Sequence, residues 1–200
     1  SWNGGGSPTA MCGLALLCYM AHGETPASKE FGPTVEKAIR YLMYAQEPSG
    51  RFKNSGPHVV YGHAIATYAL AESYGMTQMV LLKDPMEKAV KVIVDGQQAG
   101  GAFDYNYNKE GRKDMSVTAW QVQALKAAKM AGSETKGLQE ALYKCVDGVK
   151  SFSGQGGGFG YYGQGKSPTL AGAGVLCPEF LERADDAAVT ATLQATQNVS

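Results

Sequence analysis

Hydrophobic side chains recur along the chain in two alternating patterns, both with the period of an α-helix. In the first pattern one stripe is apolar and the complementary positions are polar, which is typical of a helix with one solvated face. A segment from Asp185 to Gln197 is threonine-rich and keeps this pattern more weakly. The clear stripes are Val35, Ile39 and Leu42; Met86, Val90 and Ile93; and Leu138, Leu142, Cys145 and Val149.

The second pattern is apolar on every side of the helix, as from Met11 to Met20 and from His63 to Tyr74. Such helices are buried all round, so we expect inner helices that alternate with the outer, one-sided ones. Three of the four inner segments open on Ser-Pro-Thr or Ser-Val-Thr, and the starts, at Thr9, Tyr61, Thr118 and Thr169, are 52, 57 and 51 residues apart. Serine is favoured as an N-cap and proline at the first helical position, so these segments predict helix starts.

A composite motif links each outer segment to the next inner one. The motif runs from Lys37 to Phe52 and contains, in order, a basic residue, alanine, an apolar pair, glutamine, glycine and an aromatic residue. The same order recurs at the same spacing from Lys88 to Phe103. A third copy, Lys144 to Phe159, has Ser153 in place of the glutamine. Glycine permits a tight return of the chain and the ring can fill the space between hairpins, so the motif predicts a helical repeat and its joints.

Composition narrows the function classes. With 44% hydrophobic and 18% charged residues the chain can fill one sizeable core. Its 18 basic and 18 acidic residues balance, which argues against nucleic acid or an anionic membrane surface as a partner. No apolar run is long enough to span a bilayer, and the four cysteines lack metal or disulfide spacing, so we expect buried thiols. The compartment stays open between the cytoplasm and export after removal of a leader.

The repeated motif resembles the QW repeats of squalene and oxidosqualene cyclases, which share an α/α toroid with the β-subunits of protein prenyltransferases. Phe52 and Phe103 stand where that family usually has tryptophan, and Val92 replaces an aromatic residue. The segments from Tyr61 to Thr67 and from Ser116 to Gln121 are similar to bacterial proteins with prenyltransferase and squalene oxidase repeats. The resemblance covers essentially the whole chain and implies an all-α, α/α-toroid domain over residues 1–200.

The ends of the chain suggest a segment of a longer array. Trp2 has the terminal position of a motif whose glutamine is missing, and Gln197 could begin another motif. Toroids of the family close with about six hairpins, whereas four are counted here. An incomplete ring, a tighter closed ring and pairing with another copy all fit this count, because repeats without neighbours leave apolar faces exposed.

The catalytic motifs of the family are incomplete in this sequence. The cyclases use a D-x-D-D acid, and Asp185-Asp186 has Arg183 where the first aspartate belongs. The zinc prenyltransferases use Asp-x-Cys, which does not occur here, and His58, His63 and Asp114 are only a candidate set for a metal. We therefore expect no metal and no cofactor, with hydrogen-bonded histidines and a helix-capping Asp114.

Two further chemistries fit the residues less well. A thioester of the complement type needs glutamine three residues after Cys12, and Ala15 is there. A hydrolase would need paired carboxylates, for which Asp104, Glu110 and Asp114 are available, but acidic residues in loops ordinarily lie at the solvated surface.

A binding function is the expectation that remains. If the inner helices are parallel, their N-termini offer partial positive charge at one mouth beside aromatic loops, which suits an apolar or amphiphilic, isoprenoid-like ligand. A protein partner or self-association is the other binding mode. The alternatives are a cyclase or prenyltransferase-type enzyme with its catalytic residues outside this segment, and a purely structural scaffold. The candidate binding residues are His58, Tyr61, His63, Asp114, Thr118, Trp120 and Thr169.

Overall fold

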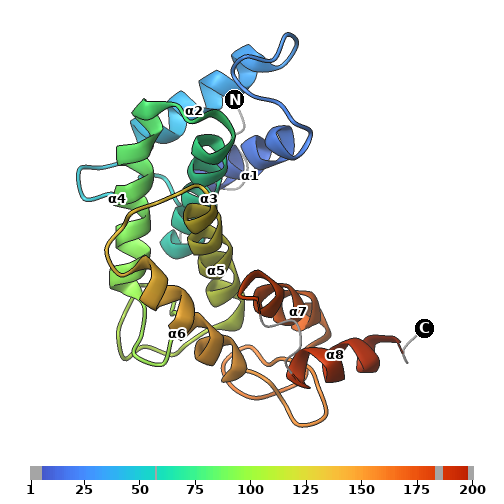
Figure 1. Ribbon diagram of the computed structural model, residues 1–200. Coiled ribbons are helices and arrows are strands. Elements are labelled where there is room, and N and C mark those ends of the chain that lie inside the picture. Colours follow the sequence, from blue (N-terminus) through green and yellow to red (C-terminus); the bar gives the residue numbers. More distant parts are fainter. Residues whose placement is uncertain (1–5, 57, 183–186, 198–200) are drawn as a thin grey trace. The chain divides into compact units, whose positions relative to one another are not determined.

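The computed structural model describes residues 6–56, 58–182 and 187–197. Within these residues the protein is all-α, as predicted: eight α-helices and one 3-10 turn, and no strand longer than an isolated bridge (Figure 1). Trp2, Arg183, Asp185 and Asp186 lie outside the described residues, as does the side chain of Gln197. The helices are α1 Pro8–Ala21, α2 Gly32–Ala45, α3 Val59–Thr77, α4 Val80–Gly96, α5 Met115–Met130, α6 Leu138–Lys150, η1 Pro168–Leu170, α7 Ala171–Phe180 and α8 Ala187–Gln197.

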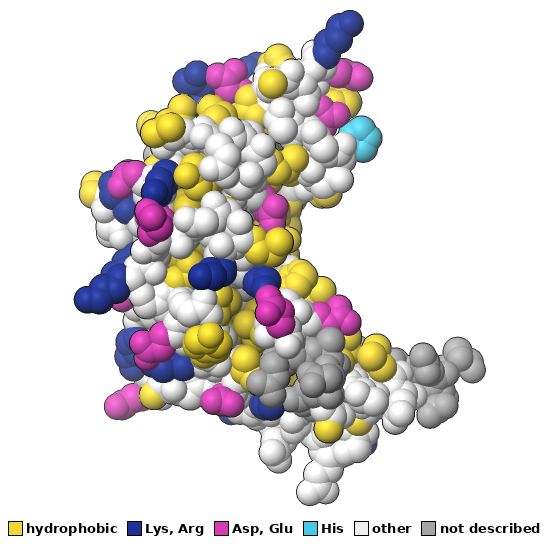
Figure 2. Space-filling view, viewed as in Figure 1, with side chains coloured by type: hydrophobic (Ala, Val, Ile, Leu, Met, Phe, Trp, Pro, Cys, Tyr) yellow, Lys and Arg dark blue, Asp and Glu magenta, His cyan; other side chains and the backbone are white. Residues whose placement is uncertain are grey.

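The described residues divide into two compact units. Unit 1 comprises residues 1–95 with 127–138, and unit 2 comprises residues 96–126 with 139–200. Charged side chains of both signs are mixed with hydrophobic ones over the face shown in Figure 2, in keeping with the zero formal charge. No helix in the described part of the chain combines the length and the apolarity that crossing a membrane requires.

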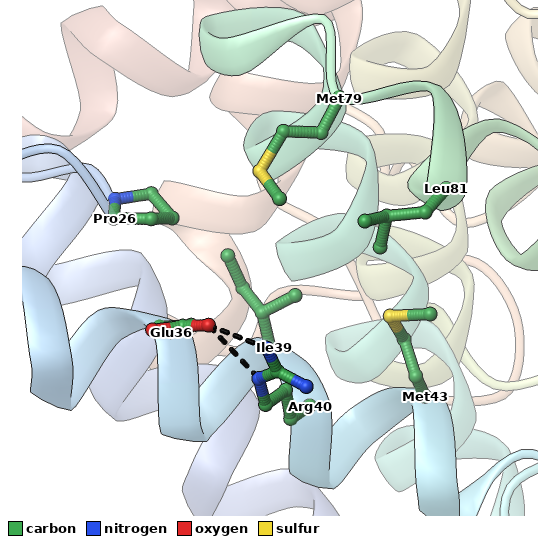
Figure 3. Close-up of a pocket in the computed structure, with 7 residues that line it drawn as sticks. All are labelled: Pro26, Glu36, Ile39, Arg40, Met43, Met79 and Leu81. Carbon is green, nitrogen blue, oxygen red and sulfur yellow. Dashed lines mark hydrogen bonds and ion pairs between the residues drawn. The ribbon is translucent and has the colours of Figure 1, made fainter.

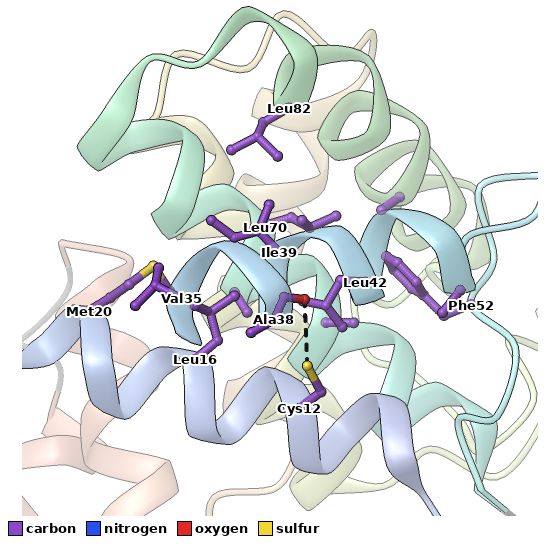
Figure 4. Close-up of a cluster of buried hydrophobic side chains, with 14 residues drawn as sticks. Cys12, Leu16, Met20, Val35, Ala38, Ile39, Leu42, Phe52, Leu70 and Leu82 are labelled. Carbon is purple, nitrogen blue, oxygen red and sulfur yellow. Dashed lines mark hydrogen bonds between the residues drawn. The ribbon is translucent and has the colours of Figure 1, made fainter. Parts of the chain in front are cut away.

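The core of unit 1 lies where α1 meets α2 and α3 (Figure 4). The predicted stripe of α2, Val35, Ile39 and Leu42, is buried there against Leu16 of α1. Helix α3 is buried over most of its length because small residues line it, and Gly13 of α1 approaches it so closely that a methyl group would stand 2.9 Å from Ile65 Cγ2. The predicted burial on all sides is therefore confirmed for α3 but wrong for α1, which is buried on one side only, like α2, and exposes Met11 and Cys18.

The cysteine prediction is confirmed at three positions and wrong at one. Cys12, Cys145 and Cys177 are buried free thiols, and burial raises the pKa of Cys12 to about 11 and that of Cys177 to about 12. The Cys12 thiol donates to the carbonyl of Ala38, 3.6 Å away. Cys18 is exposed, because the second half of α1 turns this side of the helix to solvent.

The helix starts differ from the expected serine caps. Pro8 and Pro168 do stand at the first helical positions, but neither Ser7 nor Ser167 makes a side-chain cap hydrogen bond. The Ser7 hydroxyl is packed against the Gly56 backbone instead, where an added methyl group would lie 1.8 Å from it. Helix α5 begins at Met115, one residue before Ser116, so that Asp114 takes the cap position.

The repeated motif forms the same joint in each unit. In unit 1, Gln46 Nε2 donates to the carbonyls of Gly50 at 3.2 Å and Pro85 at 2.8 Å, and so ties the end of α2 to the first turns of α4. In unit 2, Gln97 Nε2 donates to the carbonyls of Gly101 at 3.0 Å and Ala141 at 2.9 Å. The rings of Phe52, Phe103 and Phe159, one from each copy, are buried, which confirms that the motif builds hairpin joints.

The third joint, in unit 2, is held differently. Ser153 has the glutamine position, since it bridges to Phe159 as Gln46 bridges to Phe52, but its hydroxyl donates only to Lys150 within its own turn. The connection to α8 comes instead from the Gly158 N–H, which donates to Thr192 Oγ1 at 2.8 Å.

Candidate functional site

The predicted residues of unit 1 occupy two environments at the start of α3. His58 is exposed, and its ring stands edge-on to Tyr61 with 6.3 Å between centroids. His63 is 3% exposed and lies 5.3 Å from the Phe52 ring. Its Nε2 is 3.0 Å from the carbonyl oxygen of Ala89 and, since a carbonyl only accepts, it is this nitrogen that donates. His58 is thus available to solvent, whereas His63 belongs to the core.

Burial also determines the charge of His63. Its removal from water lowers the pKa of this histidine from 6.5 to about 4, and the charge of Arg51 acts in the same direction. The hydrogen bond to Ala89 opposes the shift without overcoming it. His63 is therefore neutral at pH 7, and its contacts are those of a structural histidine that links α3 to α4.

The predicted residues at the start of α5, in unit 2, are bound into a hydrogen-bond network. Asp114 Oδ1 accepts the Val117 N–H at 3.0 Å and caps the helix, while Oδ2 accepts the Tyr105 hydroxyl at 3.0 Å. Thr118 Oγ1 donates to the Asp114 carbonyl at 2.7 Å and accepts the Phe103 N–H at 3.1 Å. Asp114 and Thr118 thus fix the loop of the second motif to α5, and both are buried. This network supports the capping interpretation of Asp114.

Trp120 and Thr169 lie nearer the surface of unit 2. Trp120 is half-buried on α5. Thr169, at the start of the α7 region, is exposed and lies within hydrogen-bond distance of the hydroxyls of Ser167, at 2.9 Å, and Tyr161, at 3.3 Å. The carbonyl of Tyr161 in turn accepts the N–H of Met115, the first residue of α5, at 2.8 Å. Tyr161 therefore connects the starts of two inner-type helices.

A cation that the sequence analysis did not select completes this surface. The guanidinium carbon of Arg112 lies 3.7 Å from the centroid of the Tyr162 ring, in cation–π contact. Arg112, Tyr161 and Tyr162 are all exposed, and with Thr169 they form what we call the unit 2 rim. Arg112 stands two residues before the helix-capping aspartate, but its sequence position alone does not reveal the stacking, because the partner ring lies 50 residues further on.

The other two acidic candidates, Asp104 and Glu110, lie in different environments, because Asp104 is buried, against the expectation of a solvated loop acid, and Glu110 is exposed. Asp104 Oδ1 accepts the N–H groups of Asn106 and Asn108, at 2.9 and 2.7 Å, and so shapes its own loop, while Glu110 is exposed. Among the residues that the structure describes, no group of three or more histidine, cysteine, aspartate or glutamate side chains is placed to hold a metal ion.

Unit 1 carries a groove of about 320 Å³ that no motif pointed to (Figure 3). Its walls are mainly aliphatic and thioether side chains, and the ion pair of Arg40 with Glu36, 2.7 Å long, lies along one edge. The groove is lined by Pro26, Glu36, Ile39, Arg40, Met43, Met79 and Leu81.

Comparison with known proteins adds no assignment, because no protein-family model, curated protein or solved structure matches the chain. The function has to be inferred from these local arrangements.

Proposed function

We propose that the chain is an α/α-toroid repeat domain of the squalene cyclase and prenyltransferase type that binds an amphiphile with an anionic head and an apolar, isoprenoid-like body. The burial of α3 over most of its length beside the one-sided α2 supports this architecture, as does the joint that recurs at Gln46 and Gln97. A likeness of sequence pattern is a weak warrant for function, so the ligand has to be argued from the site itself.

The proposed ligand is inferred from the unit 2 rim. Arg112 offers a delocalised, permanently charged guanidinium that binds phosphate or carboxylate oxygens in a forked geometry. Tyr161 and Tyr162 place two exposed rings beside it, 6.0 Å apart between centroids, with hydroxyls that can donate to an anion. The partial positive charge at the start of the α7 region adds to the preference for a negative head group, whereas the start of α5 is already capped by Asp114.

The neighbouring cation is not free to do the same. Lys113 Nζ lies 3.4 Å from the Ser151 carbonyl and 4.8 Å from the centroid of the Phe152 ring, and burial lowers the pKa of its ammonium group. Lys113 therefore stabilises the loop, which leaves Arg112 as the head-group residue of the rim. The geometry supports binding without chemistry, because Asp114 is already occupied by the helix cap and by Tyr105.

Titration calorimetry with geranyl diphosphate, geraniol and inorganic pyrophosphate tests this proposal. We expect the diphosphate ester to bind with a dissociation constant on the order of 10 to 1,000 µM, and the two halves of the molecule to bind more weakly than the whole. Arg112→Gln should weaken binding by roughly tenfold, through loss of a charge-assisted contact. Arg40→Gln, which alters an exposed arginine of unit 1, is the matched control and should leave binding unchanged.

Two results would overturn the proposal. One is the absence of heat at about 1 mM ligand, a concentration at which even weak specific binding is measurable. The other is an equal loss of affinity in Arg112→Gln and Arg40→Gln, which would mean that the ester responds only to the general charge of the protein.

A further inference from the structure

Helix α3 reaches the surface of unit 1 along one narrow stripe. From Val60 to Ser73 every residue of this helix is buried except Tyr61, Tyr68 and Glu72, which are half-buried. These three positions are separated by seven and four residues, so they lie on one face of the helix. A helix that is otherwise packed on all sides therefore presents two tyrosines and one carboxylate to solvent.

The carboxylate of Glu72 has no partner in the described part of the chain, where it forms neither a hydrogen bond nor an ion pair. Helix α1 runs beside α3, with 3.2 Å between Ser73 Oγ of α3 and Met20 Sδ of α1, and α1 has no charged residue. The three lysines of α4 are each paired with an acidic side chain already. Neither of these two helices therefore supplies a cation to Glu72.

An unpaired carboxylate on a largely apolar helix is unfavourable for the folded chain. Partial removal from water raises the pKa of Glu72, and the pKa of Tyr68 is raised by burial and by the charge of Glu72. Tyr68 stands one helical turn before Glu72, so the phenol and the carboxylate lie side by side. A cation bound at this pair would offset the cost, because it would favour the charged form of Glu72.

We propose that Tyr68 and Glu72 bind a primary ammonium group carried on an apolar body. An ammonium group has three N–H donors and no acceptor, and here it meets the two carboxylate oxygens of Glu72 and the hydroxyl oxygen of Tyr68. The uncharged helix α1 beside α3 suits an apolar body. This proposal concerns unit 1 and does not depend on the ligand of the unit 2 rim.

The same residues fit other cations less well. Ca²⁺ and Mg²⁺ take about six or more oxygen ligands, which one carboxylate and one phenol cannot supply. Among the residues that the structure describes, no group of acidic, histidine or cysteine side chains is placed to complete such a shell. A guanidinium group would use the two carboxylate oxygens in its planar fork and leave the Tyr68 hydroxyl unused. A primary ammonium group uses all three acceptors.

Titration with n-hexylammonium chloride at pH 7 and constant ionic strength tests the site, with amide NMR shifts of α3 as the readout. The controls n-hexanol and sodium hexanoate have the same apolar body with a neutral or a negative head group. We expect hexylammonium to shift the amides around Tyr68 and Glu72 with a dissociation constant on the order of 1 mM. Both controls should bind at least roughly fivefold more weakly, because they cannot form the charge-assisted contact to Glu72.

Variants assign the binding to the two residues. Glu72→Gln keeps the size of the side chain and removes its charge, and should weaken binding by roughly tenfold. Tyr68→Phe removes one acceptor and should weaken binding by roughly threefold. Glu47→Gln makes the same change of charge at another half-buried glutamate of unit 1, in the loop after α2, and should bind as the wild type does. Because Glu72 is unpaired, Glu72→Gln should melt at the temperature of the wild type or above it.

Four results would contradict the inference. The α3 amides would not shift at about ten times the expected dissociation constant, or n-hexanol would bind as tightly as hexylammonium, so that only the apolar body is recognised. An equal loss of affinity in Glu72→Gln and Glu47→Gln would mean that the probe responds only to the general charge of the protein. A fall of several degrees in the melting temperature of Glu72→Gln would make Glu72 a structural residue. None of these results bears on binding of an amphiphile to the unit 2 rim.

Discussion

The joints at Gln46 and Gln97 share one design but differ in burial. Gln97 is 7% exposed and its amide reaches the Cys145 sulfur at 3.2 Å in addition to two carbonyls. Gln46 makes the same two carbonyl contacts from a half-buried position, where water can compete for them. Because an unmade hydrogen bond costs most where water cannot replace it, the same motif should carry more of the stability in unit 2 than in unit 1.

The third joint shows which part of the design can be replaced. Gly157 keeps the close approach of the motif glycine, since a methyl group there would lie 2.6 Å from the Ala191 carbonyl oxygen. The glutamine is absent, and the loop is connected to α8 by the Gly158 N–H, which donates to the Thr192 hydroxyl. The backbone approach is therefore common to all three joints, while the side chain that secures it varies.

The largest expected effect comes from the glycines. At Gly101 the backbone has φ +84°, and an added methyl group would lie 1.8 Å from the Lys144 carbonyl oxygen; at Gly50 the corresponding distance, to Lys88, is 2.4 Å. Gly101→Ala should lower the free energy of unfolding by about 4 kcal/mol or more, and Gly50→Ala by about 2 kcal/mol, because helix backbone cannot move aside. Urea denaturation followed by circular dichroism measures both.

Gly100→Ala is the control for these substitutions. Gly100 is next in sequence to Gly101, but nothing lies within 4 Å of the position that its methyl group would take. Its substitution should change the free energy of unfolding by less than about 0.5 kcal/mol. A loss at Gly100 equal to that at Gly101 would mean that loop flexibility, and not the approach to α6, makes glycine necessary.

The sequence predicted the parts of the fold that follow from periodicity. The stripe from Leu138 to Val149 became α6, Leu138–Lys150, and the apolar run from Met11 to Met20 lies within α1. The motif glycines could be recognised because their spacing recurs. The serine caps were predicted less well, since the choice between Asp114 and Ser116 depends on where the first helical turn begins, which shifts by a residue without any change of pattern.

A pH-dependent element distinguishes the two joints further. In unit 1, the Ala89 carbonyl of α4 accepts a hydrogen bond from His63, a group that can take up a proton as the pH falls. The residue of α6 that corresponds to Ala89 is Cys145, and burial raises the pKa of its thiol well above the usual range, so the thiol stays neutral. The folded pKa of His63, about 4, is below the unfolded value of 6.5, so the unfolded chain binds the proton first as the pH falls. The contribution of His63 to the free energy of unfolding is therefore complete above pH 6.5. It is lost between pH 6.5 and 4, by about 3 kcal/mol at most.

Urea denaturation at intervals between pH 7 and 4 checks this dependence. His63→Gln should remove most of the slope between pH 6.5 and 4, whatever its effect on stability at pH 7, and the exposed His22→Gln should keep the slope of the wild type. Hydrogen exchange should locate the acid-sensitive amides in α3 and α4. An unchanged slope in His63→Gln would assign the acid sensitivity to carboxylates instead.

The candidate sites were less predictable than the helices, for physical reasons. His63 and Asp114 were selected as chemistry-bearing residue types, and both have structural hydrogen bonds that their type does not reveal. Arg112 acquires its cation–π contact from the Tyr162 ring, which a glycine-rich loop places beside it. The groove of Figure 3 is lined by residues from three separate segments of the sequence, and no motif marks them.

The glutamines themselves give the smallest and most direct test of the comparison. Gln97→Ala strands the carbonyls of Gly101 and Ala141 in a buried site and should lower the free energy of unfolding by about 2 kcal/mol. Gln46→Ala exposes its two carbonyls to water and should cost about 1 kcal/mol. The exposed Gln155→Ala controls for the loss of an amide in a loop of the same kind and should be neutral within about 0.5 kcal/mol.

The difference between the two glutamine variants decides what the motif contributes. If water substitutes for the amide at the half-buried joint, Gln46→Ala loses less than Gln97→Ala, and an added stabilising osmolyte does not reverse the order. Equal losses would contradict this, because they would mean that the amide acts by bridging two helices irrespective of solvent. The third joint favours the view that the contribution of the glutamine depends on exposure to solvent. Its glutamine position is half-buried and is taken by Ser153, which makes no bond to α8. The hydrogen bond to α8 is made instead by the Gly158 N–H to the buried hydroxyl of Thr192.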